Sequence, residues 1–239
     1  MDEFNATIII EFYESLEQDL LNFLKVVPYE KQNFETWSPK LIDILVGAGS
    51  LLDSLFRTSM PEELAEKQRK DYNINDFHAV FSKDLKPLRS FVYLSPPFVL
   101  QPYKNWTQSA PLAWWDHYNK VRHDRLENMR FATMQTAMDV LCALFEAIVQ
   151  NQKMGKALLR HRWTDLGGFN PDLIMPKLDS QRLSDAIGMM GRHTLFVQSK
   201  LFATTLGSEI LPESISDIKP MQYVGAKRLV IFLGKWMGY

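Results

Sequence analysis

The 239-residue sequence has little cysteine, little glycine and no long hydrophobic run. Its single cysteine, Cys142, excludes an internal disulfide and favours a reducing compartment. Eleven glycines are few for a turn-rich β-sandwich. The longest apolar segment, residues 137–149, contains two acidic side chains, whereas a membrane-spanning helix needs about 20 largely apolar residues. These absences predict a soluble cytoplasmic protein with neither a membrane anchor nor a signal peptide.

The charge is nearly balanced over the whole chain but unevenly distributed along it. The formal net charge of −1 argues against a globally basic nucleic-acid-binding protein. Residues 1–60 carry ten acidic and four basic side chains, so the rest of the chain is mildly basic. A local phosphate-binding patch is compatible with this distribution, and solvated helix faces are the alternative explanation.

Helical periodicity dominates the first two thirds of the sequence. Apolar side chains recur every three or four residues over 8–27, which predicts an amphipathic helix. A second helix is predicted to begin at Pro39, with Ser38 as its N-cap. We therefore predict a mainly α protein, with a helical domain over 1–160 and a mixed α/β appendage over 161–239.

Two more helical regions complete the predicted helical domain. A short helix over 73–85 would be capped by Asn75 or Asp76. A long helical region is predicted over 111–152, with a break near 123–127 where the charged residues are dense. The wide apolar face of its second half predicts burial on more than one side.

The remaining segments have weaker signals. Residues 91–110 combine aromatic side chains with three prolines, which predicts an extended connector. In the appendage we expect a short helix over 180–190, and the threonine- and phenylalanine-rich stretch 193–206 favours a β-hairpin. The apolar stretch 229–233 is also typical of a strand.

The densest set of chemically active side chains lies in residues 114–125. On a helix, Asn119 and His123 are one turn apart and share a face, and Tyr118 and Arg122 form a neighbouring pair. Histidine can transfer protons near neutral pH, and arginine can bind a phosphate through two parallel hydrogen bonds. This combination suits phosphodiester chemistry on RNA, whose 2′-hydroxyl supplies the nucleophile. A helix anchored by tryptophans, with a solvated charged face, is the alternative.

The same segment resembles the signature of a known family. Bacterial HEPN-like proteins are similar to this chain over WWDHYNKVRHDR at 114–125 and the FATMQTAMDVLCALF that follows. One group among them also resembles the chain at WSPKLIDILVGAGSLLDSLFR, residues 37–57, and at NINDFHAVF, residues 73–81. The motif of this family is arginine, a polar residue that is often asparagine, three further residues and histidine. Asn119 and His123 match it, whereas Tyr118 stands at the arginine position.

The resemblance implies a HEPN-like helical bundle that forms a homodimer and cleaves RNA without a metal or cofactor, as toxin and phage-defence members do. It implies that His123 is the general base or acid, that Asn119 orients the phosphate or the histidine, and that Arg122 stabilises the transition state. The residues expected to contact the substrate are Tyr118, Lys120 and Arg125.

The tyrosine at the arginine position leaves the enzyme class open. The alternative is a non-catalytic helical dimer that binds a nucleotide, RNA or a protein partner such as an antitoxin. His117 is expected to point to a different face of the helix from Asn119. The basic cluster around His161 is compatible with phosphate contacts, and the favoured interpretation is cations at the C-terminal end of a helix. The spacing of cysteine and histidine predicts no metal site.

Overall fold

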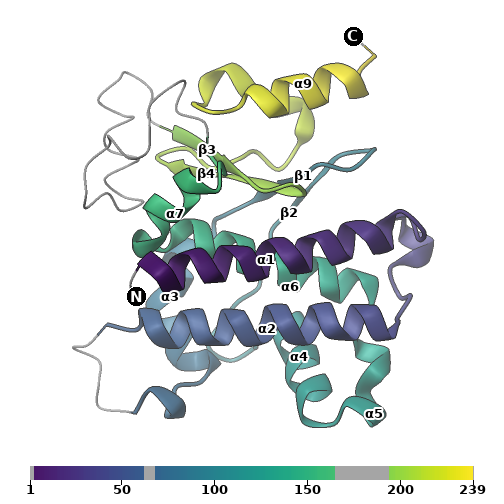
Figure 1. Ribbon diagram of the computed structural model, residues 1–239, viewed down its shortest axis with the longest axis vertical. Coiled ribbons are helices and arrows are strands. Elements are labelled where there is room, and N and C mark those ends of the chain that lie inside the picture. Colours follow the sequence, from purple (N-terminus) through teal and green to yellow (C-terminus); the bar gives the residue numbers. More distant parts are fainter. Residues whose placement is uncertain (1–2, 62–67, 165–193, 239) are drawn as a thin grey trace. The chain divides into compact units, whose positions relative to one another are not determined.

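The computed structural model describes residues 3–61, 68–164 and 194–238. It is mainly helical, with a small four-stranded antiparallel sheet (Figure 1). The chain divides into two compact units. We call them the sheet unit, which takes its described residues from 1–10, 87–101 and 148–239, and the helical unit, which takes them from 11–86 and 102–147.

The elements are named as in Figure 1. The α-helices in the described residues are α1 Glu3–Leu24, α2 Pro39–Ser59, α3 Ile74–Leu85, α4 Ala113–His123, α5 Arg125–Asn128, α6 Met134–Gln150, α7 Gly155–Arg160 and α9 Lys227–Trp236. The strands are β1 Ser90–Val92, β2 Phe98–Leu100, β3 Thr194–Gln198 and β4 Phe202–Gly207. The 3-10 turns are at Lys31–Asn33, Arg69–Asp71, Met129–Phe131, Gln152–Met154, Ile215–Asp217 and Pro220–Gln222.

The predicted start of α2 is confirmed. Ser38 precedes the helix in an extended conformation, and its hydroxyl accepts a hydrogen bond from the backbone N–H of Leu41 at 3.2 Å. Pro39 occupies the first turn, where its missing N–H costs no intrahelical bond. The helix predicted over 8–27 is also present as α1, although it begins five residues earlier.

The predicted cap of α3 is wrong by two or three residues. The N-cap is Asn73, whose side-chain oxygen accepts hydrogen bonds from the N–H groups of Asn75 and Asp76. The carboxylate of Asp76 accepts a hydrogen bond from the N–H of Asn73 in return, at 2.9 Å. This reciprocal capping box starts the helix before the residues that the sequence analysis favoured.

The break predicted near 123–127 is confirmed. Helix α4 ends at His123, and the carboxylate of Asp124 then caps α5 by accepting a hydrogen bond from the N–H of Glu127. Thr133 caps α6, because its hydroxyl accepts the N–H of Thr136 at 3.2 Å. Two caps within ten residues therefore divide the long helical region into α4, α5 and α6.

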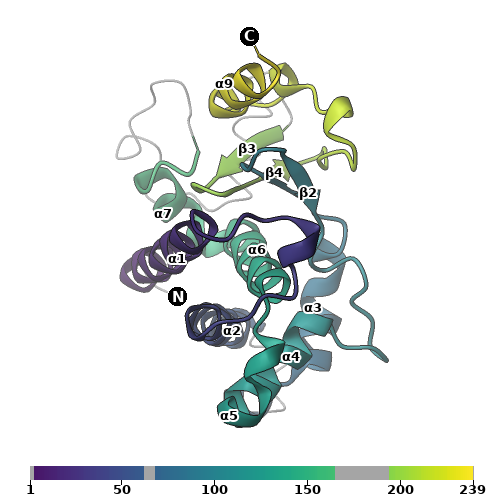
Figure 2. The same ribbon diagram turned by 90° about the vertical axis from the view of Figure 1, so that its right-hand side faces the viewer.

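The helical unit is organised by a close contact between α2 and α4, which lie side by side in Figures 1 and 2. The ring of Tyr118 is fully buried against Gly49. A Cβ atom at Gly49 would lie only 2.3 Å from Cδ2 of that ring. The absence of a side chain at Gly49 is therefore what allows the tyrosine ring to approach α2.

The rest of the buried face of α4 is aromatic. Trp114, Trp115 and Val121 lie on it together with the tyrosine. The ring of Trp115 meets Phe77 of α3 edge to face, with 6.2 Å between the centroids. The indole N–H of Trp114 donates to the carbonyl of Pro102 at 3.0 Å. These contacts determine which faces of α4 are left for solvent and for ligands.

In the sheet unit the strand order is β2-β1-β4-β3, and every pair is antiparallel. The hairpin predicted within 193–206 is confirmed as β3 and β4. Residues 91–110 are not only a connector, because β1 and β2 come from this region and β1 pairs with β4. The helix predicted over 180–190 lies outside the described residues.

The strand predicted over 229–233 is wrong, because these residues belong to α9. Leu229 and Leu233 are one helical turn apart and are both buried, whereas Val230 and Ile231 are exposed. Figure 1 shows α9 lying across one face of the sheet, and its leucines share a core cluster with Phe91 and Phe196. The period of burial is helical, and the short apolar run alone does not reveal it.

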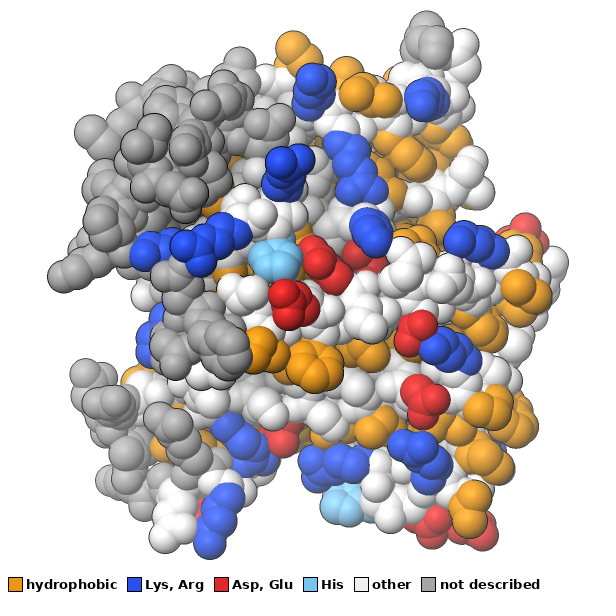
Figure 3. Space-filling model, viewed as in Figure 1, with side chains coloured by type: hydrophobic (Ala, Val, Ile, Leu, Met, Phe, Trp, Pro, Cys, Tyr) orange, Lys and Arg blue, Asp and Glu red, His pale blue; other side chains and the backbone are white. Residues whose placement is uncertain are grey.

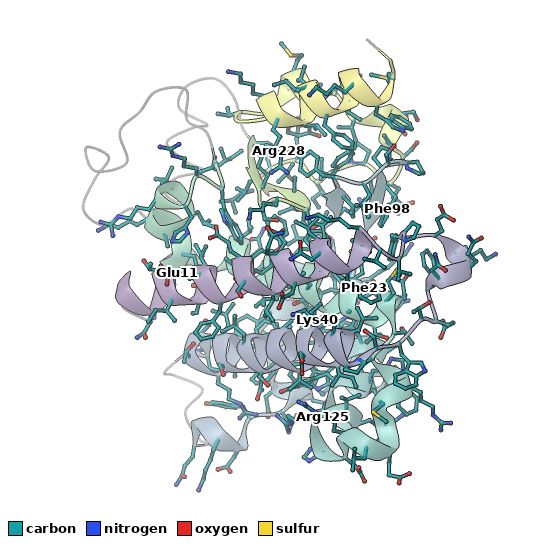
Figure 4. The ribbon with its side chains drawn as sticks, turned by 45° about the vertical axis from the view of Figure 1, so that its right-hand side comes forward. Glu11, Phe23, Lys40, Phe98, Arg125 and Arg228 are labelled. Carbon is teal, nitrogen blue, oxygen red and sulfur yellow. The ribbon has the colours of Figure 1, made fainter. Side chains whose placement is uncertain are left out.

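One arginine fastens α9 to the β-hairpin of the same unit. The Arg228 guanidinium donates hydrogen bonds to the carbonyls of Ser199 and Lys200 in the β3–β4 turn. It also lies over the ring of Tyr93, 4.3 Å from the centroid. Figure 4 labels Arg228 between α9 and the strands. A bidentate guanidinium clamp of this kind orders the turn and the helix together.

Across the described ranges 3–61, 68–164 and 194–238, no helix has the length and apolar character required to span a membrane.

We predict that Gly49→Ala destabilises the protein, although alanine has the higher helix propensity by about 1 kcal/mol. The added methyl group would overlap the buried ring of Tyr118. Overpacking typically costs about 1–3 kcal/mol, so thermal unfolding monitored by circular dichroism should move down by several degrees.

Gly234→Ala is the matched control, because Gly234 is also inside a helix and has nothing within 4 Å of an added Cβ atom. We expect it to leave the melting temperature unchanged or slightly raised. Equal effects of the two substitutions would contradict the α2–α4 contact.

Candidate functional site

The residues singled out by the sequence lie at the C-terminal end of α4, in the helical unit. The Arg122 guanidinium donates to the hydroxyl of Tyr118 at 3.1 Å and packs over its ring, with Cζ 5.2 Å from the centroid. The same hydroxyl lies 3.3 Å from Oγ of Ser50. Tyr118 therefore does not reach solvent, and the guanidinium stands at the tip of its phenol.

The guanidinium also contacts His123 and a carboxylate of α2. Nη2 of Arg122 lies 3.4 Å from Nε2 of His123. A guanidinium only donates, so this contact is a hydrogen bond when Nε2 of His123 carries no proton. Nη1 lies 3.8 Å from Oδ2 of Asp53, whose Oδ1 accepts a hydrogen bond from Arg57 at 3.0 Å. Arg122 and His123 are both exposed.

Asn119 shares the face of His123, as predicted, but one of its polar atoms is already engaged. Its side-chain N–H donates to the carbonyl of Trp115 at 3.1 Å, one turn earlier in α4. In the part of the chain that the structure describes, its Oδ1 has no hydrogen-bond partner. The amide can therefore still offer its oxygen and its second N–H to a ligand.

The other two predicted contact residues lie further from His123 and are paired with carboxylates. Lys120 forms an ion pair with Asp116 at 2.7 Å. Arg125 at the start of α5, labelled in Figure 4, lies 3.5 Å from Asp43. Figure 3 shows Lys and Arg side chains over α4 and α5, with a histidine among them and acidic side chains nearby. Exposed pairs of this kind are weak and can exchange partners with a phosphate.

The structure adds a second feature that the sequence analysis missed, a pocket of about 560 Å³ in the helical unit. His117 of α4 lines it, on a different face from Asn119, as predicted. Two further residues of α4 and residues from three other segments complete the lining: Ala113, Trp114, Glu35, Trp37, Arg130, Phe131, Thr133, Gln135, Thr136 and Asp139. Their spacing in the sequence gives no common pattern, so only the fold reveals the pocket.

Backbone hydrogen bonds hold one wall of the pocket on the start of α6. The carbonyl of Thr36 accepts from the N–H of Met134 at 2.8 Å, and that of Phe34 accepts from the N–H of Gln135 at 3.1 Å. These bonds place Glu35 and Trp37 at the pocket mouth, where both side chains are exposed.

His117 is tied to the pocket floor through one ring nitrogen. Nδ1 lies 3.0 Å from the hydroxyl of Thr136, which in turn lies 3.1 Å from that of Thr133. Burial lowers the pKa of His117 and outweighs the neighbouring Asp116 carboxylate, which acts in the opposite direction. The imidazole is therefore neutral near pH 7, with one ring nitrogen held and the other left for a ligand.

Asp139 is held by a short relay of polar side chains. The hydroxyl of Tyr29 donates to Oε1 of Gln135 at 2.6 Å, which turns the Gln135 amide N–H toward Asp139 Oδ1 at 2.9 Å. Burial raises the pKa of Asp139 from its ordinary value of 3.8 to about 6, and the hydrogen bond from Gln135 offsets part of this rise. A carboxyl group and an imidazole with opposite pKa shifts in one pocket are typical of functional sites.

Nothing in the described part of the chain forms a metal centre, since no three His, Cys, Asp or Glu side chains there are placed to share an ion. Comparison with protein-family models, with curated proteins and with solved structures finds no match. The functional argument therefore depends on the geometry of α4 and its neighbours.

We predict that Asp139→Asn stabilises the protein at neutral and alkaline pH. The raised pKa of Asp139, about 6, means that the folded chain holds this proton more tightly than the unfolded chain does. Ionisation of Asp139 therefore lowers the free energy of unfolding as the pH rises from 4 to 6. Because the side chain is partly exposed, we expect a cost of about 2 kcal/mol at pH 8.

The measurement is the melting temperature of both proteins from pH 4 to pH 8. The difference should be close to zero at pH 4, grow through pH 6 and stay constant above pH 7. A difference that is independent of pH would contradict the raised pKa of Asp139.

Proposed function

We propose that this protein is a HEPN-like, metal-independent endoribonuclease that acts as a homodimer, with His123 as the group that transfers the proton. The observation that carries the proposal is the position of the Arg122 guanidinium, 3.1 Å from the hydroxyl of Tyr118 and 3.4 Å from Nε2 of His123. An arginine is missing at position 118 of the motif, but Arg122 supplies a guanidinium at the same end of the helix, beside the histidine.

In the proposed reaction, His123 takes the proton of a ribose 2′-hydroxyl, whose oxygen then attacks the adjacent phosphorus. The bond from phosphorus to the 5′-oxygen breaks, and this oxygen takes a proton from the partner's His123, which enters the step as the imidazolium and leaves it neutral. The products are a 2′,3′-cyclic phosphate and a free 5′-hydroxyl. Arg122 stabilises the additional negative charge on the phosphate oxygens, and Asn119 orients the phosphate.

Asp53 has a positioning role in this scheme. Its carboxylate is anchored by Arg57 and lies 3.8 Å from the Arg122 guanidinium. The distance is long for a charge-assisted hydrogen bond, so Arg122 keeps donors available for a phosphate. When the Arg122 guanidinium turns from Nε2 of His123 to the phosphate, this nitrogen becomes available to accept the proton.

A second candidate function is a non-catalytic helical dimer that binds RNA, a nucleotide or a protein partner. The observation that favours it is that Lys120, Arg122 and Arg125 each lie within 4 Å of a carboxylate. This mutual compensation reduces the electrostatic attraction of a polyanion, so within this alternative it favours the protein partner. Because both candidates are dimers, RNA cleavage is the property that distinguishes the two functions.

We predict that the purified protein cleaves single-stranded RNA in excess EDTA and leaves a cyclic phosphate end. His123→Ala should reduce the rate at least about 100-fold, because the proton-transferring group is lost. Arg122→Ala should have a similar effect, and Arg122→Lys a smaller one, since lysine retains the charge without the planar fork. Gel analysis of labelled RNA measures the rates.

His161→Ala is the control for the loss of a histidine, because His161 follows α7 and belongs to the sheet unit. It should cleave at the wild-type rate. An oligonucleotide of identical sequence without 2′-hydroxyls should remain intact. RNA that is not cleaved by the wild-type protein would refute the catalytic proposal and favour the non-catalytic dimer.

We also predict a homodimer in solution. Light scattering after size exclusion should give twice the chain mass of 27.8 kDa at micromolar concentration. His123→Ala should remain dimeric, since the exposed imidazole makes little contribution to folding. A monomer that still cleaves RNA would exclude a composite site across two chains.

A further inference from the structure

The pocket beside His117 is separate from the proposed RNA site. His117 and His123 are six residues apart on α4, which corresponds to about 9 Å along the helix axis and about 120° around it. The pocket lies against α6 and the 34–37 segment, whereas Arg122 and His123 lie on the side of Asp53 in α2. A ligand in the pocket therefore need not contact the residues that would cleave RNA.

The polar floor of the pocket offers acceptor atoms without partners. Asp139 accepts one hydrogen bond at Oδ1, and in the described residues its Oδ2 has no hydrogen-bond partner. His117 is held at Nδ1 and has no partner at Nε2 in the same set of residues. A primary ammonium group has three N–H donors on one nitrogen atom. It can therefore donate to the Asp139 oxygen and to the His117 nitrogen at the same time.

The charges around the pocket favour a cationic ligand. Asp139 and Glu35 are the carboxylates that line it, and Arg130 is the lining cation. Arg130 is exposed and stacks on the Phe131 ring at 5.3 Å, so solvent screens its charge. Burial raises the pKa of the Asp139 carboxyl to about 6, and no lysine or arginine in the described residues forms an ion pair with it. A cation at the floor would remove this cost.

The walls of the pocket favour an apolar or aromatic body on the ligand. Trp37 is 47% exposed and stands at the mouth, whereas Trp114 is 4% exposed and lies deeper. The Phe131 ring also lines the pocket, 5.1 Å from the His117 ring, with Lys120 and Arg130 at 4.8 and 5.3 Å from its centroid. A volume of about 560 Å³ lies within the range of sites for small organic ligands.

We propose that this pocket binds a small organic amine, with the ammonium group on Asp139 and His117 and an aromatic or aliphatic body against Trp37 and Trp114. The Tyr29–Gln135–Asp139 relay orients the carboxylate before the ligand arrives, so that little ordering is needed on binding. In the tautomer whose Nδ1–H donates to Thr136, Nε2 of the neutral His117 imidazole accepts the second ammonium hydrogen bond. Glu35 at the mouth attracts the cation.

The test is isothermal titration calorimetry with tryptamine at pH 8 and low ionic strength. Tryptamine joins an ammonium group to an indole ring. We expect saturable binding to the wild-type protein and binding at least tenfold weaker to Asp139→Asn, which keeps the shape of the side chain and removes its charge. Indole-3-acetate, which has the same ring and an anionic group, should not bind.

Asp19→Asn is the matched control variant, because Asp19 is a carboxylate of the same unit that pairs with Lys40 outside the pocket. It changes the net charge equally and should bind tryptamine like the wild-type protein. Equal affinities for Asp139→Asn and Asp19→Asn would overturn the proposal, as would indole-3-acetate or tryptophan binding as tightly as tryptamine. Since RNA cleavage is not measured, the result is independent of the proposed ribonuclease function.

Discussion

Both candidate sites depend on the close packing of α4 on α2. The ring of Tyr118 lies where a side chain at Gly49 would otherwise be, and a Cβ atom there would approach the ring to 2.3 Å. This contact sets the rotation of α4 about its own axis. Since successive residues are turned by about 100°, the rotation decides that Arg122 faces Asp53 and that His117 faces α6.

The buried tyrosine is also the position at which the chain differs from the HEPN motif that its sequence resembles. An arginine at position 118 would have to bury its charge against Gly49, which is costly without a carboxylate partner. The phenol is compatible with this position because its ring is apolar and its hydroxyl bonds to Arg122. The guanidinium is thereby moved to the exposed side of the helix, next to His123, where a phosphate can reach it.

The α2–α4 contact stabilises the fold, whereas the pocket contains a side chain that destabilises it. Its polar floor is partly unsatisfied, because Asp139 has a single hydrogen-bond donor and burial raises the carboxyl pKa to about 6. Burial of the ionised Asp139 carboxylate lowers the free energy of unfolding, and a bound cation would remove this cost. The Tyr29–Gln135 relay is consistent with binding, since it orients the carboxylate without neutralising it.

The sequence by itself determined the helices with strong local signals. Ser38 and Pro39 start α2, and the charged break after His123 divides α4 from α6, because capping and periodicity act over a few residues. Only the tertiary structure decided that residues 229–233 form a helix, since that depends on packing against the sheet. It also decided the pocket, because Trp37 and Asp139 are a hundred residues apart and meet only through long-range contacts.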